Sequence, residues 1–210
     1  MAREGWPFLV PALLLTAVAA AVGWTAVAAF LALLTLFFLQ FFRDPERHSA
    51  AGPMDILSPA DGTILSIGPA PEAPAGASRR ISVFMSPFNC HVNRASLSGE
   101  VTDYAYVPGR KLAAFDEKAS QENEQNRITL TGERGALVFK QIAGSIARRV
   151  VFRGKVGDRV SRGDRIGIIK FGSRCDIFVP DGAQVLVERG APVKAGVTAL
   201  ARWGSPPPPP

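Results

Sequence analysis

The first absence in this 210-residue chain is charge: no charged residue lies between positions 6 and 42, and Gln40 is the only amide there. A helix that spans a membrane needs about 20 apolar residues, so this stretch is nearly twice that length. It is also far longer than the core of a secretory signal, and no Ala-x-Ala site with a polar mature start follows it. We therefore expect a segment that stays in the membrane.

This apolar stretch can adopt either of two arrangements. One is a tight helical hairpin over about 6–22 and 25–42 with Gly23 at its turn; the other is a single tilted helix. A single helix rises about 1.5 Å per residue and would overshoot the bilayer, so the hairpin is favoured. Arg3 lies at one end, and Arg43 and Arg47 follow the other. The positive-inside tendency then predicts that both ends face the cytoplasm.

Cysteine and histidine are also scarce. Cys90 and Cys175 are the only cysteines, and in a domain that faces the cytoplasm we expect free thiols. The histidines are His48 and His91, and we predict no metal site. The net charge of +6 beside a membrane segment indicates an anionic lipid surface as partner, and not nucleic acid, although an ordinary solvated basic surface is the plain alternative.

Clear helical periodicity is largely missing after position 42. Short β-branched or alternating runs, bounded by Gly, Pro, Asn or Asp, predict strands at 56–67, 81–85, 100–107, 127–131, 136–142, 165–170, 176–179 and 184–187. Residues 113–123 are expected to form a loop or a short helix, and 143–152 are a weaker helix candidate. Residues 69–76 are expected to form a linker loop, and the proline tail an extended stub.

A weak internal repeat adds to the fold prediction. Gly157 and Gly163 have a valine between them, and Gly190 and Gly196 repeat this spacing 33 residues later. Glycines at such tips supply positive φ angles at little steric cost. The repeat resembles the hairpins of biotinyl- and lipoyl-type flattened barrels, without their modified lysine. The predicted class is mainly β (α+β), a flattened barrel or sandwich with lipoyl-like hairpins after an apolar helix hairpin.

Three short motifs carry candidate chemistry. Gly172–Ser173 lies at a break between two predicted strands, where a hydroxyl is placed to attack the preceding carbonyl, although most Gly-Ser pairs are plain turns. Asp61, in Ser-Pro-Ala-Asp-Gly at 58–62, is either a structural Asx-turn residue or a functional carboxylate. His91 lies in a loop after a strand, and such loops often carry sites, although a single histidine is more often structural.

Together these features resemble the phosphatidylserine decarboxylases, specifically the short single-domain branch of that pyruvoyl-dependent family. Four motifs carry the resemblance, in this order: Phe-Arg-Asp-Pro at 42–45, Ser-Pro-Ala-Asp-Gly at 58–62, Phe-Met-Ser-Pro-Phe-Asn-Cys-His-Val-Asn-Arg at 84–94 and Phe-Gly-Ser-Arg at 171–174. Longer members have Leu-Gly-Ser-Thr at the last motif, where this chain has Phe171 and Arg174. They also have a second histidine where this chain has Arg94, which leaves the base of self-cleavage open between Asp61 and His91.

The resemblance implies a proenzyme that cuts itself between Gly172 and Ser173. Residue 173 then becomes a covalent pyruvoyl cofactor, which forms a Schiff base with phosphatidylserine and allows its decarboxylation to phosphatidylethanolamine. It implies Ser173, His91 and Asp61 as catalytic residues and Arg94 and Arg174 as substrate-binding residues. The fragments 1–172 and 173–210 are expected to remain together as a heterodimer, and a homo-oligomer is left open.

The expected domains are a membrane hairpin at 1–45, the decarboxylase domain at 46–204 and a proline-rich tail at 205–210. The enzyme is expected at the cell membrane, with its catalytic domain facing the cytoplasm. Because the site residues follow Ile56, the apolar stretch is expected to serve membrane residence and not the chemistry. The alternatives are a membrane-anchored, lipoyl-like adaptor without catalysis, or a pyruvoyl decarboxylase of a different amino-acid-derived lipid.

Overall fold

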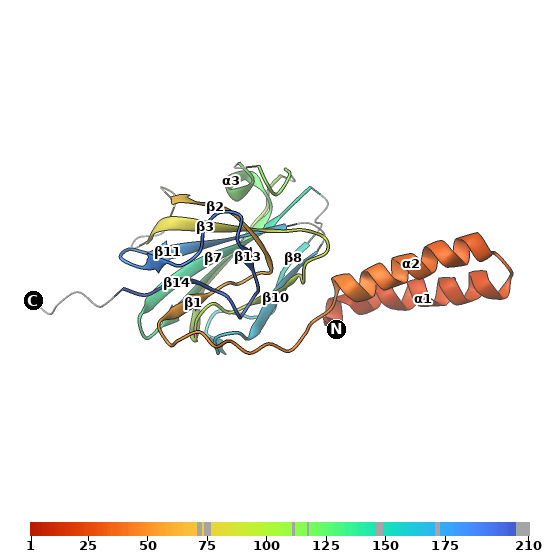
Figure 1. Ribbon diagram of the computed structural model, residues 1–210, viewed down its shortest axis with the longest axis horizontal. Helices are drawn as coiled ribbons and strands as arrows, with labels where there is room; N and C mark the ends of the chain where they lie inside the picture. The colour runs from red at the N-terminus through yellow and green to blue at the C-terminus, as the bar shows by residue number, and fades with distance from the viewer. Residues whose placement is uncertain are drawn as a thin grey trace, which may run out of the picture.

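The computed structural model describes residues 1–70, 73, 77–110, 112–116, 118–145, 149–170 and 173–204. A pair of helices projects from one side of a β domain (Figure 1). The helical elements are η1 (Arg3–Gly5), α1 (Trp6–Ala21), α2 (Thr25–Phe41) and α3 (Ala119–Glu122). The strands are β1 (Asp55–Leu57), β2 (Gly62–Pro69), β3 (Ala77–Met85), β4 (Val92–Arg94), β5 (Gly99–Val107), β6 (Gln125–Gly132), β7 (Gly135–Ala143), β8 (Arg149–Phe152), β9 (Arg159–Val160), β10 (Arg165–Lys170), β11 (Ser173–Pro180), β12 (Gln184–Val185), β13 (Pro192–Val193) and β14 (Ala199–Arg202).

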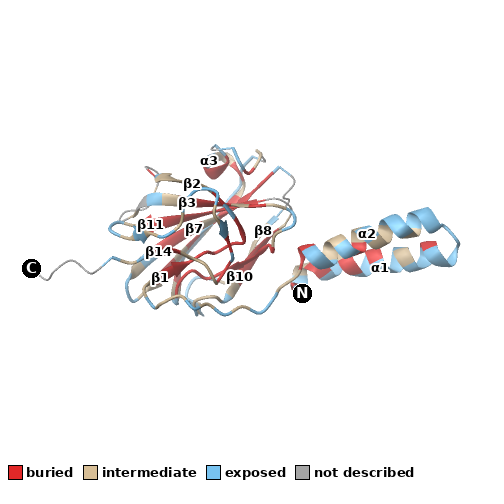
Figure 2. Cartoon of the chain, viewed as in Figure 1, coloured by how far each residue is buried: buried red, intermediate tan, exposed pale blue. Residues whose placement is uncertain are grey.

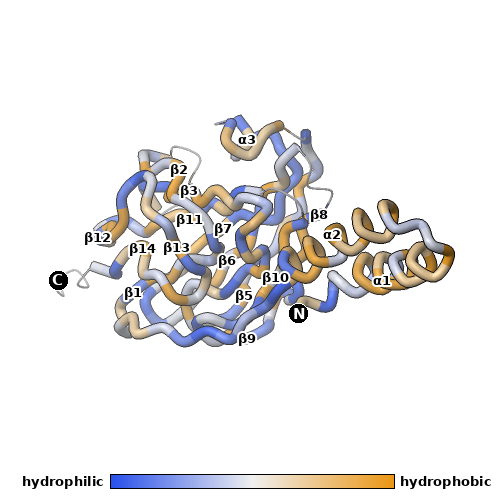
Figure 3. Tube along the Cα trace, turned by 45° about the vertical axis from the view of Figure 1, so that its right-hand side comes forward, coloured by the Kyte–Doolittle hydropathy of each residue, from blue (hydrophilic) through white to orange (hydrophobic). Residues whose placement is uncertain are grey.

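Helices α1 and α2 lie side by side and are joined by a tight turn at Gly23, whose φ of 78° suits glycine. Thr16 and Thr35 face each other with their hydroxyl oxygens 3.5 Å apart. Most other side chains of the pair are apolar and exposed, among them Trp24 and Leu33 (Figures 2 and 3). Residues 3–21 form a helix that is long and apolar enough to cross a membrane, and α2 is apolar but shorter.

The β domain is built around an eight-stranded antiparallel sheet in the order β13-β2-β3-β11-β7-β6-β5-β9. Two three-stranded sheets, β1-β14-β12 and β4-β10-β8, accompany it. The large sheet curls around a core that includes Ile81, Leu130 and Phe139 (Figure 1). The mainly β class predicted from the sequence is therefore confirmed.

Strand β11 lies in the middle of the large sheet, paired with β3 and β7. Its side chains alternate, so that Cys175, Ile177 and Val179 belong to the main core. On the opposite face, Phe178 belongs to a smaller apolar cluster.

The glycines of the internal repeat all have positive φ angles, between 68° and 92°. They flank β9 and β13, the two-residue strands at the opposite edges of the large sheet. The repeat therefore marks how the two edges of the sheet end. Its likeness to lipoyl-type hairpins stays a prediction.

Two of the predicted elements differ from the structure in kind or in number. Residues 149–152 form β8, which pairs with β10, and this contradicts the helix candidate at 143–152. The apolar residues of β8 complete a sheet, and this overrides a weak helical pattern. In addition, the single strand expected over 56–67 is two strands, because Ser58 to Asp61 form a turn between β1 and β2.

Candidate active site

Ser173 is the first residue of β11 and is fully buried. Its hydroxyl donates to Met85 Sδ at 3.2 Å, and a thioether sulfur is a weak acceptor. Strand β10 ends at Lys170, so the predicted cleavage point lies between two strands. Phe171 and Gly172 themselves lie outside the described residues. The structure thus gives Ser173 a hydroxyl that is buried but weakly held.

His91 lies just before β4, after a turn in which Asn89 Oδ1 accepts a hydrogen bond from the Ser86 amide. Its Nδ1 lies 3.0 Å from the Asn89 carbonyl oxygen. A carbonyl only accepts, so Nδ1 carries the proton and Nε2 has the free lone pair in the neutral ring. Nε2 is buried without a hydrogen-bond partner among the described residues.

The surroundings of His91 keep its imidazole neutral. The ring is fully buried and stacks on Phe41, with the ring centroids 4.1 Å apart. Burial lowers the pKa of His91 to about 4; the Asn89 carbonyl and the Asp61 charge oppose this shift, and Arg43 adds to it. His91 therefore offers an uncharged ring nitrogen that can take up a proton.

Strand pairing brings the loop of His91 to the predicted cleavage point. Met85, which ends β3, is paired with Ser173, and the Ile169 amide donates to the His91 carbonyl oxygen at 3.3 Å. The two contacts hold Met85 beside Ser173 and His91 beside Ile169. Two motifs that are far apart in the sequence therefore meet at one place.

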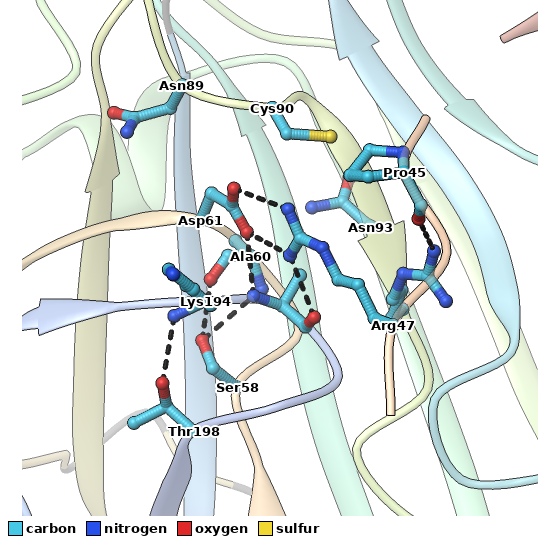
Figure 4. Close-up of polar contacts among 12 residues, drawn as sticks. Pro45, Arg47, Ser58, Ala60, Asp61, Asn89, Cys90, Asn93, Lys194 and Thr198 are labelled. Atoms are coloured by element: carbon cyan, nitrogen blue, oxygen red, sulfur yellow. Dashed lines mark hydrogen bonds and ion pairs between the residues drawn. The ribbon is translucent and has the colours of Figure 1, made fainter. Parts of the chain in front are cut away.

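Asp61 precedes β2 and is nearly buried. Arg47 forms hydrogen bonds with both of its carboxylate oxygens: Nη2 donates to Oδ2 at 2.7 Å, and Nη1 donates to Oδ1 (Figure 4). The Ala195 amide also donates to Oδ1, at 2.7 Å. No hydrogen bond joins Asp61 to His91 among the described residues, although its charge raises the pKa of that ring.

These contacts differ from those of a simple Asx turn. The turn at 58–61 is closed by Ser58, whose hydroxyl donates to the Ala60 carbonyl oxygen at 2.7 Å. Asp61 instead bonds residues that are distant in sequence. The next residue must be small, because a Cβ on Gly62 would lie 2.0 Å from the Phe84 carbonyl oxygen. This close approach of β2 to β3 fixes the position of Asp61.

Arg94 and Arg174 are both buried and paired within the chain. Arg94 donates to the Gly163 and Pro45 carbonyl oxygens, each at 2.8 Å. Arg174 donates to Asp176 Oδ1 at 2.6 Å and to Ser82 Oγ at 2.7 Å, on the face of β11 opposite Ser173. In this structure both guanidinium groups hold elements of the fold together.

The site also contains residues that the sequence analysis missed. Phe41 and Arg47 contact His91 and Asp61, and both come from the segment that leaves α2. Asn93, on β4, donates to the Pro59 carbonyl oxygen and accepts from Gln141. The run of charged residues at 43–48 was the available sequence signal for this contribution. The spacing of these residues does not predict that Arg47 pairs with Asp61.

The expectation that the apolar stretch serves only membrane residence also differs from the structure. Phe41 and Phe42 are fully buried in a cluster with Cys90, Val92 and Ile168 of the β domain. The end of α2 is therefore part of the packing around His91.

The described residues include no group of three or more His, Cys, Asp or Glu arranged to hold a metal ion. A groove of about 800 Å³ lies elsewhere in the β domain, lined in part by Leu97, Thr131 and Trp203, and none of the predicted site residues lines it. The site described here is a buried arrangement of side chains and not that open groove.

Comparisons with known proteins agree with the four motifs. Residues 34–201 match the family model described as phosphatidylserine decarboxylase. The chain is 43% identical over 202 residues to a phosphatidylserine decarboxylase proenzyme of Geotalea uraniireducens (strain Rf4), covering 95% of each chain. It is 45% identical over 213 residues to the proenzyme of the same name from Trichlorobacter lovleyi, covering 96% of this chain and 95% of the relative. The proenzyme of that name from Geobacter sulfurreducens is 44% identical over 207 residues, 95% of each chain.

Proposed function

Because the chain belongs to the phosphatidylserine decarboxylase family, whose members are carboxy-lyases, we propose that it decarboxylates phosphatidylserine to phosphatidylethanolamine with a pyruvoyl group made from its own Ser173. One observation carries the proposal: Met85 pairs with Ser173, and the His91 backbone accepts a hydrogen bond from Ile169, so the residue with the buried hydroxyl and the residue with the neutral imidazole pair with the two strands on either side of the proposed cleavage point. The name proenzyme, printed for the relatives, agrees with a chain that must be cut.

The self-cleavage begins at Ser173. Its Oγ attacks the carbonyl carbon of Gly172, the amide C–N bond breaks, and an ester joins the two residues. Loss of the Cα proton of residue 173 then expels the Gly172 carboxylate and leaves dehydroalanine. Water converts the dehydroalanine to a pyruvoyl group and releases ammonia. The products are chains 1–172 and 173–210.

His91 is the proposed base for this step. Its Nε2 has a free lone pair, and its lowered pKa keeps the ring unprotonated at neutral pH. Asp61 is the other candidate, but both of its oxygens already accept hydrogen bonds from Arg47 and Ala195. We therefore assign Asp61 the role of a fixed negative charge, which stabilises His91 when that ring takes up the proton.

The surroundings of Ser173 suit a pyruvoyl group. When formed, that group supplies a carbonyl that condenses with the serine amine of the substrate and accepts the electron pair as CO₂ leaves. The side chains of Ser173, Met85 and Phe41 are fully buried, so bulk water has little access to this region in the uncut chain. His91 is the proposed donor of the proton that replaces CO₂ at the substrate Cα.

Arg94 and Arg174 stay predicted substrate-binding residues. Each is already paired within the chain, so binding a phosphate or carboxylate would require these internal contacts to be exchanged. Their internal pairing favours a structural role in the uncut chain.

We further propose that α1 and α2 form a membrane hairpin, so that the β domain is held at the cytoplasmic face of the cell membrane. The support is the apolar, exposed surface of both helices and the basic residues Arg3, Arg43 and Arg47 at their common end. The proposed domains are the hairpin at 1–45, the decarboxylase domain at 46–204 and the tail at 205–210. An anionic lipid surface, which presents the substrate, is the proposed partner.

The two fragments are proposed to stay together after the cut. The small fragment contains β11, and also β13 and β14, which pair with β2 and β1 of the large fragment. Because β11 lies between β3 and β7, removing it would divide the large sheet.

Intact-mass spectrometry of the purified protein tests the proposal. We expect two chains split between residues 172 and 173, with the small one lacking a free amino terminus. The Ser173→Ala chain is expected to stay full length and to release no CO₂ from phosphatidylserine in detergent micelles. An active preparation that contains only the uncut 210-residue chain would overturn the proposal. Turnover of another amino-acid-derived lipid in place of phosphatidylserine would keep the chemistry and change the substrate.

A further inference from the structure

We propose that the segment from Phe41 to Arg47, which leaves α2, is a positioning element of the active site: Arg47 sets the carboxylate of Asp61 and Phe41 sets the ring of His91. The inference rests on the proposed function, because it names the residues that arrange the two groups assigned to self-cleavage. It makes docking of the apolar helices a condition for maturation of the chain.

The segment is fastened to the β domain along its whole length. Arg43 donates to the Phe88 carbonyl oxygen at 2.9 Å. Asp44 accepts from Arg165, with Nε 2.7 Å from Oδ2, and also pairs with Arg94. The Glu46 carboxylate accepts from Arg165 at 2.6 Å. A linker that only tethers an anchor would not need a partner at each successive residue.

Unlike the contacts of Arg43, Asp44 and Glu46, the contact of Arg47 is with a proposed catalytic residue, Asp61. Arg47 binds both oxygens of Asp61, and it also donates to the Ala195 carbonyl oxygen at 2.9 Å (Figure 4). A bidentate guanidinium–carboxylate contact fixes the plane of the carboxylate as well as its position. The Ala195 amide donates to the same carboxylate, at Oδ1, so Asp61 has little freedom to turn.

The pair is shielded from solvent, since the side chains of Arg47 and Asp61 are 11% and 10% exposed. A carboxylate this deeply placed stays ionised at little cost only when a cation is beside it. Asp61 in turn raises the pKa of Arg47, chiefly through their hydrogen bonds. Loss of Arg47 would therefore leave the Asp61 carboxylate without its paired cation and without its fixed orientation, and both support a protonated His91.

Phe41 acts on the second group. Its ring stacks on the imidazole with an interplanar angle of 26°, and both side chains are fully buried. The Asn89 carbonyl fixes the ring at Nδ1, and the stacked phenyl group fixes its plane. Nε2 is thereby held in one direction without a partner of its own.

Maturation of the full-length chain, followed as the appearance of fragment 173–210 over time, tests the inference. Arg47→Met keeps the bulk of the side chain but removes the charge, and we expect self-cleavage to slow by about tenfold or more. Arg47→Lys keeps the charge without the bidentate contact and is expected to fall between Arg47→Met and the wild type. Arg165→Met is the matched comparison: it removes contacts of the same segment at Asp44 and Glu46 but touches neither Asp61 nor His91, and we expect a clearly smaller effect on cleavage than that of Arg47→Met.

A double-mutant cycle separates positioning from a general structural role. If Arg47 acts through Asp61, adding Arg47→Met to Asp61→Asn should slow cleavage little further, because the charge it positions is already gone. Effects that multiply would overturn the inference. So would wild-type cleavage by Arg47→Met, or loss of the melting transition when Arg47→Met is placed in the uncut Ser173→Ala chain. A wild-type chain that is never cut at residue 172 would instead refute the proposed function itself.

Discussion

Burial sets the protonation state of His91 more strongly than any neighbouring charge does. Loss of solvent is the largest cause of the lowered pKa, which is about 4; the Asn89 carbonyl and the Asp61 charge raise the pKa, and the Arg43 charge lowers it further. A histidine in this setting works as a base at neutral pH without first losing a proton. The two-histidine composition of the chain makes this state directly measurable.

The first prediction concerns this titration. In the uncut Ser173→Ala chain, with carbon-13 in its histidine rings, we expect the His91 signal to keep its neutral position from pH 8 down to about pH 5. A His48→Gln exchange assigns the signal, and a histidine peptide in the same buffer, which titrates at about 6.5, is the reference. A His91 signal that moves together with the peptide would contradict the buried ring.

The same pKa shift has a consequence for stability. The unfolded chain binds a proton on His91 at about 6.5 and the folded chain at about 4. Between these values the unfolded state holds more protons, so the free energy of unfolding rises with pH. We therefore infer that this contribution is complete above about pH 6.5 and declines as the pH falls toward 4.

The second prediction concerns Arg174. Its guanidinium pairs with the fully buried Asp176 and also donates to Ser82, so Arg174→Met would leave the Asp176 carboxylate with the more distant Arg80, whose Nε lies 3.8 Å from Oδ2, as its cation. We expect the uncut Ser173→Ala chain to lose about 3 kcal/mol of unfolding free energy, with no change in KM when the exchange is made in the cleaved enzyme. The control is Arg127→Met, because Arg127 pairs with Asp103 in solvent and should cost less than about 1 kcal/mol. A higher KM with unchanged stability would support substrate binding instead.

At this scale the sequence predicted the residues that lie in recognisable motifs. Ser173, His91 and Asp61 lie in short motifs, and the neighbouring residues in each motif indicate the chemistry of the candidate residue. Arg47 and Phe41 could not be assigned in this way, because their roles depend on contacts across 14 and 50 residues of chain, respectively. Such contacts follow from how the strands pair, which local spacing does not encode.

At the scale of elements, the pairing of β2 with β3 determines the position of Asp61. Thr63 pairs with Phe84, and the register shifts between Ile64 and Ser66. At the start of β2 the two backbones approach so closely that Gly62 has no room for a side chain. The position of the carboxylate is therefore a consequence of a backbone contact.

The third prediction tests this contact with two glycines of the same strand. Gly62→Ala would place a methyl group 2.0 Å from the Phe84 carbonyl oxygen, and we expect a loss of about 2–3 kcal/mol together with slower self-cleavage. Gly68 lies in β2 with nothing within 4 Å of an added Cβ, so Gly68→Ala should change stability by less than about 0.5 kcal/mol. Melting of the uncut Ser173→Ala chain provides the comparison. Equal effects at the two positions would argue against the backbone contact as the cause.

Elements were predictable where a strand contributes alternate side chains to the main core. Residues 136–142 and 176–179 fall within β7 and β11, whose alternating side chains meet the main core. The helix candidate at 143–152 was wrong because β8 is a short strand whose residues are only partly buried, so no alternation marks it. The two-residue strands β9 and β13 were visible only through their flanking glycines.

At the scale of the whole molecule, the apolar helices and the β domain are not separate units. The Ala2 amide donates to the Phe42 carbonyl oxygen at 2.8 Å, and Arg153 pairs with Glu4 at 2.6 Å. Together with the buried cluster around Phe41, these contacts place both ends of the helical pair on the β domain close to His91. The sequence indicated an anchor followed by a self-sufficient barrel, because composition changes sharply near position 43 while docking contacts leave no compositional mark.

The fourth prediction compares two shortened chains in detergent micelles. A chain that begins at Ser49 keeps every strand and all three proposed catalytic residues but lacks Phe41 and Arg47. Without them His91 loses its stacked partner and Asp61 its cation, so we expect this chain to stay largely uncut at residue 172. A chain that begins at Gln40 lacks nearly all of both helices but keeps the positioning segment, and we expect it to mature. Near-ultraviolet circular dichroism of the Ser173→Ala forms checks that both fold. Rapid cleavage of the chain that begins at Ser49 would show that the barrel alone assembles the site, and that the close packing of α2 against His91 serves attachment and not catalysis.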